Sequence, residues 1–336
     1  MNLKTIAHLA GVSTVTVSNV INGKYNKASK ETVERIRRII EETGYRPSAT
    51  ARSLIMKRSH IICVVIPNLS ADAPVSVSPY NTQIIGYLDR YIRSRGYYMM
   101  LRCVADSREV LPDFATWNVD GAFFLGVCAE DALHLGEKLD IPAVFIDTYA
   151  RGGPLATVGI EDHKGGYLAA SHLLDMGHRQ IAFVSTPTTF PGVMQERYRG
   201  FCDAFRERGL PFLRECCFET RETFYEQGVD VGRMIAASDK GFTAVAAMAD
   251  IVALGIMEGL RQAGLRVPQD VSVMGFDDLP ECRYAHPKLT SISQHLEEKA
   301  QQAGQYLFSM LDGGLPLTVS KTVDVALIPR ESVAKL

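Results

Sequence analysis

The chain has 336 residues, more than one ordinary hydrophobic core can organise, so two or three domains are expected. Hydrophobic residues make up 46% of the chain, the net charge is −2, and no apolar run is long enough to span a membrane. No basic-then-apolar export signal precedes the helix predicted near Leu3, so we expect a soluble, cytoplasmic protein with no membrane partner.

The cysteine and histidine spacings argue against a metal site. The seven cysteines form no Cys-x-x-Cys pair, and the eight histidines include no pair four residues apart. Zinc sites and disulfide frameworks need such regular spacings. We therefore expect reduced thiols, no metal and no cofactor.

The first two predicted helices form a helix-turn-helix. The run from Thr5 to Ala10 has a buried face at helical spacing that includes Leu9, and Gly11 ends it because a left-handed C-cap favours a residue without a Cβ atom. Ser13 can cap the second helix by accepting a bond from a backbone N–H. The second helix divides into a buried apolar face (Val17, Val20 and Ile21) and an exposed face (Thr14, Val15, Ser18, Asn19 and Asn22).

Two features favour DNA as the partner of this exposed face. Val15 lies about 200° from Val17 on a helical wheel, and an exposed valine suits contact with a thymine methyl group. The first 58 residues hold 11 Lys and Arg against 4 Glu, a net charge of +7, so the rest of the chain carries −9. A basic module on an acidic body is the electrostatic footprint of a nucleic-acid-binding protein.

A third helix and a short linker follow the helix-turn-helix. Ser29 and Thr32 offer caps for the third helix, and Gly44 with Pro47 ends it. The nine residues 48–56 are too few to form a stable isolated helix in water.

From Ile61 onward, short apolar strands alternate with longer helical runs. Two such series in tandem imply two doubly wound parallel α/β subdomains behind an all-α head. The crossover 104–119 is only sixteen residues long. In the second series, Asp250 is expected to cap the helix 250–262, which begins at this residue. Strands are predicted at 61–66, 98–103, 122–127, 143–147, near 158, 181–185, 244–248, 271–276, 289–293 and 322–327, and helices at 83–95, 162–176, 195–207, 226–237, 250–262 and 296–311.

These motifs together resemble the LacI/GalR family of bacterial transcription regulators over essentially the whole chain. The resemblance rests on "TIAHLAGVSTVTVSNVING", "ETGYRPSATARSL" and the body just described. It implies a DNA-binding head at 1–47, a hinge helix at 48–58 and an effector-binding and dimerisation domain at 59–336. The last resembles periplasmic sugar-binding proteins, with an N-subdomain of about 59–160 and 293–322 and a C-subdomain of about 161–292 and 323–336.

The resemblance implies how the head and the hinge contact DNA. In the family, the hinge helix pairs with its twin in the dimer and inserts a leucine, here Leu54, into the minor groove. The family often carries arginine where this chain has Asn19, so we expect an altered operator half-site. The residues predicted to contact DNA are Thr5, Ser13, Thr14, Val15, Thr16, Ser18, Asn19, Asn22, Ala51, Leu54 and Lys57.

Polar residues at strand ends predict an effector site. Open α/β sheets bind ligands beyond the carboxyl ends of their strands, although aspartates there often only cap helices. "ERYRGF" and "VMGFDD" match family motifs whose Arg197 and Asp277 usually bind the effector, and Asp147 matches a third, weaker position. The predicted effector-binding residues are Tyr80, Asp147, Phe190, Arg197, Phe224 and Asp277.

Two departures from the family pattern leave the effector open. Ala249 stands where the family has asparagine, and Thr223 stands where an aromatic platform is common, with Phe224 next to it. Tyr80, Phe190 and Phe276 could each supply a ring or simply pack in the core. We expect a sugar or sugar derivative, while phosphorylated, neutral and nucleobase effectors all remain possible.

Three functions are compatible with this pattern. The first is a dimeric repressor that binds a pseudo-palindromic operator under effector control, since no leucine heptads for tetramerisation follow Ser332. The second is a solute-binding sensor whose helical head is a protein-interaction module. The third is a Rossmann-type enzyme, but GxGxxG after the first strand, a P-loop and a GxSxG elbow are all missing, so we expect no enzymatic activity.

Overall fold

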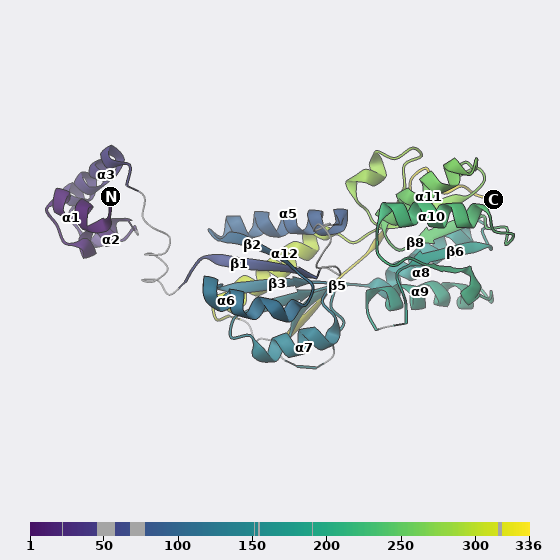
Figure 1. Cartoon of the computed structure of the whole chain (residues 1–336), viewed down its shortest axis with the longest axis horizontal. Helices are drawn as coiled ribbons and strands as arrows, with labels where there is room; N and C mark the ends of the chain where they lie inside the picture. The colour runs from purple at the N-terminus through teal and green to yellow at the C-terminus, as the bar shows by residue number, and fades with distance from the viewer. Residues whose placement is uncertain are drawn as a thin grey trace. The chain divides into compact units, whose positions relative to one another are not determined.

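The computed structural model describes residues 1–21, 23–45, 58–67, 78–150, 152–153, 155–189, 191–314 and 318–336. It consists of two compact units, Met1–His60 and Ile61–Leu336. The first is the helical head and the second holds all of the described strands (Figure 1).

The head is a three-helix unit with its own small core. Gly11 ends α1 with φ 61° and Gly44 ends α3 with the same φ, as their positions in the sequence predict. Leu9 is 54% exposed, so its predicted place in the core is wrong, and Ala7, two residues earlier on the helix, is buried instead. The helices are α1 (Leu3–Ala10), α2 (Thr14–Ile21) and α3 (Lys30–Thr43), with a 3₁₀ turn η1 (Tyr25–Lys27) before α3.

The first half of the second unit is a six-stranded parallel sheet with the order β11-β5-β4-β3-β1-β2. Helices α5 and α12 cover one face, and α6 with α7 covers the other (Figure 1). The strands are β1 (Ile61–Pro67), β2 (Tyr98–Val104), β3 (Gly121–Leu125), β4 (Ala143–Ile146), β5 (Ala156–Ile160) and β11 (Val319–Val323), and the helices are α5 (Pro79–Ser94), α6 (Leu111–Trp117), α7 (Ala129–Lys138) and α12 (Leu296–Leu311).

The second half repeats this plan with the order β12-β10-β9-β8-β6-β7, in which only β12 runs antiparallel. Helices α10 and α11 cover one face, and α8 with α9 covers the other (Figure 1). The strands are β6 (Ile181–Ser185), β7 (Cys217–Glu219), β8 (Ala244–Ala247), β9 (Ser272–Asp277), β10 (Thr290–Ser293) and β12 (Ala326–Ile328), and the helices are α8 (Asp162–Asp175), α9 (Val193–Glu207), α10 (Tyr225–Ala236) and α11 (Asp250–Gln262).

The predicted class, two doubly wound α/β halves behind a helical head, is therefore confirmed. The crossover 104–119 contains a 3₁₀ turn η2 (Ser107–Val110) followed by the short helix α6. The single strand predicted at 322–327 is wrong, because the chain passes there from β11 of the first sheet to β12 of the second. Among the described helices, none is both long and apolar enough to cross a membrane.

Candidate effector site and DNA-binding head

The second helix of the head presents the predicted reading face. The Ser13 hydroxyl accepts a hydrogen bond of 3.1 Å from the amide of Thr16, so the predicted cap is confirmed. Val17 and Val20 are buried, while Val15 is 66% exposed, because it lies on the far side of the helix. The remaining described positions of the predicted DNA contacts are exposed (Thr5 and Ser13) or half-buried (Thr14, Thr16, Ser18 and Asn19). The predicted contacts Asn22, Ala51, Leu54 and Lys57 lie outside the described residues.

Helices α1 and α3 and the segment between α2 and α3 carry exposed cations. Seven of them have exposed side chains, and the guanidinium of Arg37 lies 4.7 Å from the ring centroid of Tyr25. Exposed cations neutralise DNA phosphates and release their counterions, so the head has the charge that non-specific DNA affinity requires. These residues are Lys4, Lys24, Lys27, Lys30, Arg35, Arg37 and Arg38.

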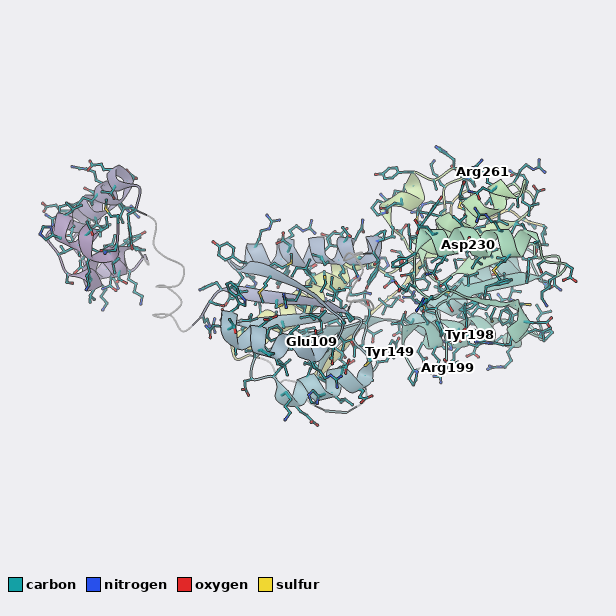
Figure 2. All side chains as sticks on the ribbon, viewed as in Figure 1. Glu109, Tyr149, Tyr198, Arg199, Asp230 and Arg261 are labelled. Carbon is teal, nitrogen blue, oxygen red and sulfur yellow. The ribbon has the colours of Figure 1, made fainter. Side chains whose placement is uncertain are left out.

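A cleft of about 500 Å³ lies between the two halves of the second unit, at the carboxyl ends of both sets of strands. Each sheet contributes residues that follow its strands, as expected for an open α/β sheet. Four of the predicted effector residues line it, namely Tyr80, Asp147, Arg197 and Asp277. Tyr149, which also lines it, lies at the junction of the two halves (Figure 2).

Arg197 is held by a buried ion pair on the C-terminal side of the cleft. Its Nε donates to Asp162 Oδ1 at 2.8 Å, its Nη1 donates to the carbonyl of Met248 at 2.9 Å, and its Cζ lies 3.6 Å from the centroid of the Phe276 ring. Tyr149 donates to the second oxygen of Asp162 at 2.7 Å. Burial raises the pKa of Asp162, and the charge of Arg197 opposes this rise. An arginine stays protonated in proteins, so we treat the two as an ion pair.

Two glycines bring Arg197 and Asp162 together. A Cβ atom on Gly200 would lie 1.8 Å from the carbonyl oxygen of His163, and one on Gly166 would lie 1.9 Å from the carbonyl oxygen of Arg197. Helices α8 and α9 therefore approach more closely than any larger residue would allow. This close approach places Asp162, the first residue of α8, within hydrogen-bond distance of Arg197 on α9.

On the N-terminal side, Asp147 belongs to a network that the sequence did not predict. The Nζ of Lys299 lies 2.9 Å from Asp147 Oδ1, 3.0 Å from the Tyr80 hydroxyl and 2.6 Å from Gln294 Oε1. Tyr80 in turn donates to Asp147. Burial and the charge of Asp147 raise the pKa of Tyr80, so its hydroxyl keeps its proton. Lys299 is completely buried, and only its pairing with Asp147 makes this burial tolerable.

Asp277 is the last residue of β9, where the chain enters a strained turn. Asp277 and Asp278 both have positive φ values, 124° and 57°. The carboxylate of Asp277 accepts from Gln294 Nε2, and burial raises its pKa to about 7 although the charge of Arg197 opposes this. Asp278 pairs instead with Arg330 and does not line the cleft.

Several other predicted positions lie elsewhere. Phe224 does not line the cleft, because it is the extended residue before α10 and its neighbour Thr223 faces the cleft. Phe276 lies under Arg197 and is fully buried, and Phe190 lies outside the described residues. Asp250 makes no cap for α11, and its carboxylate accepts from Leu279, Cys282 and Ser291.

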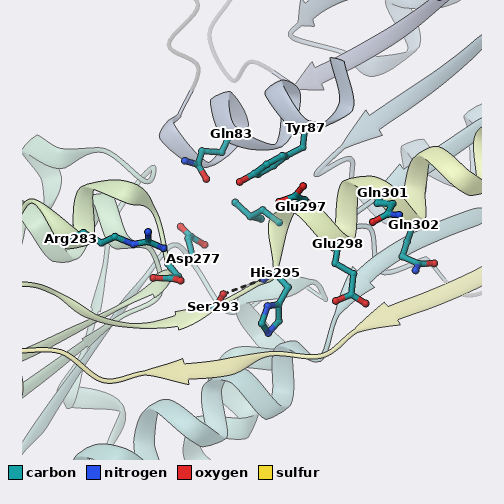
Figure 3. Close-up of a pocket in the computed structure, with 12 residues that line it drawn as sticks. Gln83, Tyr87, Asp277, Arg283, Ser293, His295, Glu297, Glu298, Gln301 and Gln302 are labelled. Carbon is teal, nitrogen blue, oxygen red and sulfur yellow. Dashed lines mark hydrogen bonds between the residues drawn. The ribbon is translucent and has the colours of Figure 1, made fainter. Parts of the chain in front are cut away.

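A second groove, of about 640 Å³, is lined by residues of α5 and α12 and by Asp277, Asp278 and Arg283 (Figure 3). Gln83 and Tyr87 line it from α5, and Glu298 and Gln302 line it from α12, with Asp277 between the two grooves. It lacks Arg197, Asp147 and Tyr80. The cleft that holds these three is therefore the better candidate for the effector site. The described residues hold no group of three or more His, Cys, Asp or Glu that could bind a metal ion.

Comparison with known families supports both units. Residues 2–48 match the family described as bacterial regulatory proteins, lacI family. Residues 170–333 match the periplasmic binding protein-like domain.

The curated relatives are transcriptional repressors. The HTH-type transcriptional repressor PurR of Glaesserella parasuis serovar 5 is 33% identical over 310 residues, which cover 90% of this chain and 87% of that protein. The protein of the same name from Erwinia tasmaniensis is 34% identical over 348 residues, covering 99% and 96%.

Solved structures with this fold include complexes with sugars. The transcriptional regulator CelR–cellobiose complex is 26% identical with a TM-score of 0.73, each chain covered to 99%. A LacI family regulator from Enterococcus faecium with bound ribose is 26% identical with a TM-score of 0.71, covering 82% of this chain and 99% of that one. The lac repressor dimer bound to operator and the anti-inducer ONPF has a TM-score of 0.84 at 23% identity, with 99% of each chain covered, and so shows the fold alone.

The relatives act in transcription, and the identity to them extends over head and body together. The chain belongs to the LacI family and is a DNA-binding transcriptional repressor, not an enzyme.

Proposed function

We propose that the repressor acts as a homodimer on a pseudo-palindromic operator and that a sugar or sugar derivative in the cleft controls its DNA affinity. The observation that carries this proposal is the convergence of Tyr80, Asp147, Arg197 and Asp277 on one cleft between the two sheets. These residues come from four different segments, and their carboxylate, guanidinium and phenol groups can bond to hydroxyl groups on a ligand.

The lining of the cleft favours a polyhydroxylated ligand over a flat nucleobase. A nucleobase is usually held by stacking on an aromatic face. Among the described residues that line the cleft, only Tyr80 and Tyr149 are aromatic, and both use their hydroxyls to bond carboxylates. Two structural neighbours at 26% identity were solved with cellobiose and with ribose.

A thermal-shift screen tests the effector class. The screen contains sugars, sugar phosphates and nucleobases at matched concentrations. We expect a sugar or sugar derivative to raise the Tm of the full chain and to change operator affinity. A nucleobase that does both, while every sugar compound does neither, would contradict the proposed class.

The charge of the head supports a DNA contact made largely through phosphates. If the dimer neutralises about six phosphates, its affinity should fall roughly 10³-fold or more between 50 and 200 mM salt. Fluorescence anisotropy with labelled operator measures this fall. An affinity independent of salt would contradict the proposed mode of binding.

The edge of the first sheet supports dimerisation through the N-terminal half. β2 is the edge strand, and it exposes Tyr98 and Leu101, while the neighbouring helix α6 exposes Trp117. Exposed apolar groups on an edge strand are typical of protein interfaces. Analytical ultracentrifugation should show a dimer, and Tyr98→Glu should shift it toward monomer. A Tyr98→Glu variant that stays fully dimeric would place the interface elsewhere.

A further inference from the structure

Two buried pairs of opposite charge lie at the cleft, and each contributes one residue to its lining, Arg197 in one pair and Asp147 in the other. Arg197 pairs with Asp162 at 2.8 Å, and Lys299 pairs with Asp147 at 2.9 Å. The side chains of Arg197 and Asp162 are 5% and 0% exposed, and those of Lys299 and Asp147 are 0% and 14% exposed. Burying a charge is costly unless an opposite charge accompanies it, so each pair is complete without a ligand.

Lys299 has no donor left for a ligand. An ammonium group has three N–H donors, and those of Lys299 point to Asp147, Tyr80 and Gln294. A lysine in a binding site commonly holds a phosphate, but this one is occupied by acceptors of the protein itself.

Arg197 has only part of its hydrogen-bonding capacity left. Its Nε and Nη1 are bonded to Asp162 and Met248, and its charge is balanced by Asp162. Its remaining N–H groups can therefore donate to a neutral oxygen of a ligand. Among the described residues that line the cleft, Arg197 is the only lysine or arginine.

Asp277 adds an acidic group that makes no direct ion pair, although the charges of Arg197 and Lys299 lower its pKa from a distance. Within the part of the chain that the structure describes, no lysine or arginine lies within ion-pair distance of Asp277, whose carboxylate accepts from Gln294. An anionic ligand would thus lie beside the acidic group of Asp277. The one cation in the described lining, Arg197, is already balanced by Asp162. Ligand hydroxyls, in contrast, could donate to Asp277 and to Asp147.

We infer that Asp162 and Lys299 are specificity-determining residues that restrict the cleft to an uncharged, polyhydroxylated effector and exclude phosphorylated or carboxylated forms. The inference rests on the proposed function, in which this cleft binds the effector. Asp162 acts by balancing Arg197, and Lys299 acts by balancing Asp147 while its own donors remain occupied. The sequence alone leaves phosphorylated and neutral effectors equally open.

Removing one carboxylate charge at a time tests the inference. Asp162→Asn leaves Arg197 without its counter-charge, and Asp147→Asn does the same to Lys299, while both keep the size of the side chain. The probe is inorganic phosphate, titrated into the full chain by calorimetry at constant ionic strength. We expect each variant to bind phosphate at least tenfold more tightly than the unsubstituted chain does.

The matched control is Asp175→Asn, which unpairs Arg208 on the surface, where the side chains are 64% and 29% exposed. Water solvates an exposed guanidinium, so this variant should gain no phosphate binding. Circular dichroism verifies that each variant is folded. Two folded cleft variants with no gain in phosphate affinity would overturn the inference.

A measurement on the unsubstituted chain remains decisive even if both cleft variants fail to fold. Glucose and ribose are compared with glucose 6-phosphate, ribose 5-phosphate and inorganic phosphate by direct calorimetric titration and by thermal shift. Saturable binding of a phosphorylated sugar or of phosphate in the cleft overturns the inference but leaves the cleft as the effector site. Absence of phosphate and sugar-phosphate binding supports the inference. If no sugar of the wider screen binds either, that result contradicts the proposed sugar effector, which is a separate claim.

Discussion

The ammonium group of Lys299 donates to both carboxylate oxygens of Asp147, at 2.9 Å and 3.1 Å, although the two residues are 152 positions apart in the chain. Lys299 lies on α12, and Asp147 follows β4 with a φ of 58°. The pair therefore holds the segment after β4 against α12, a helix from a distant part of the chain that packs on the same sheet.

Lys299→Met should lower the free energy of unfolding by about 3 kcal/mol, because it leaves a largely buried carboxylate without its counter-charge. Urea denaturation of the full chain measures the change. The control Lys164→Met breaks an exposed pair with Asp324, and should cost less than about 1 kcal/mol. Equal effects of the two substitutions would mean that the buried pair contributes no more than a surface pair.

Asp277→Asn should reduce the pH dependence of stability. The pKa of Asp277 is about 7 in the folded chain, raised from 3.8 by burial, so between about pH 4 and pH 7 the folded state holds a proton that the unfolded state has lost. The contribution of Asp277 to stability is therefore present at low pH and is lost as pH rises toward 7. Thermal unfolding from pH 5 to pH 8 should show a smaller decline in the variant. An equal decline in both proteins would show that Asp277 ionises normally.

Asn19→Arg should change the preferred base at one position of each operator half-site. Asparagine pairs best with adenine and arginine with guanine, and the wrong base costs about 1–3 kcal/mol. Selection of binding sites from random DNA compares the two proteins. Identical selected sites would remove Asn19 from base readout.

Leu54 lies outside the described residues, and its role as a minor-groove wedge stays a prediction. Leu54→Ala should weaken specific DNA binding by about a few kcal/mol, the order of the unstacking energy that such a wedge offsets. Effector binding should be unchanged, because the cleft is formed by other residues. A variant that binds and bends operator like the parent would show that another residue is the wedge.

Helical periodicity predicts most of the helices because one face of each is buried, and continuous apolar runs predict most of the strands because helices cover both faces of each sheet. The helix Asp250–Gln262 and the strand Ile181–Ser185, for example, have the predicted bounds. The sequence does not predict β7, because a strand of three residues carries too little pattern. It also does not separate β11 from β12, because only two residues, Asp324 and Val325, lie between the two strands.

The candidate site was predictable only in part. Arg197 and Asp277 belong to motifs, so the sequence pointed to them. Lys299 follows two glutamates in an amphipathic helix, a pattern typical of a solvated face, and its burial depends on partners far away in the chain. Phe224 was predicted from its proximity to Thr223, but the direction of a side chain depends on local backbone angles that composition does not reveal.

We propose above all that the cleft controls DNA binding. A ligand that bridges the two halves can shift a two-state equilibrium only by its differential affinity for the two states, about 1–3 kcal/mol in typical cases. Arg197 and Asp277 lie in the cleft and not in the head, so Arg197→Ala and Asp277→Ala should leave unliganded operator affinity near normal. The direct measurement is a titration of operator with each variant, with and without the effector that the screen identifies. We expect the effector to lose its influence on operator affinity in both variants. A full effector response in both would contradict control of DNA binding by the cleft.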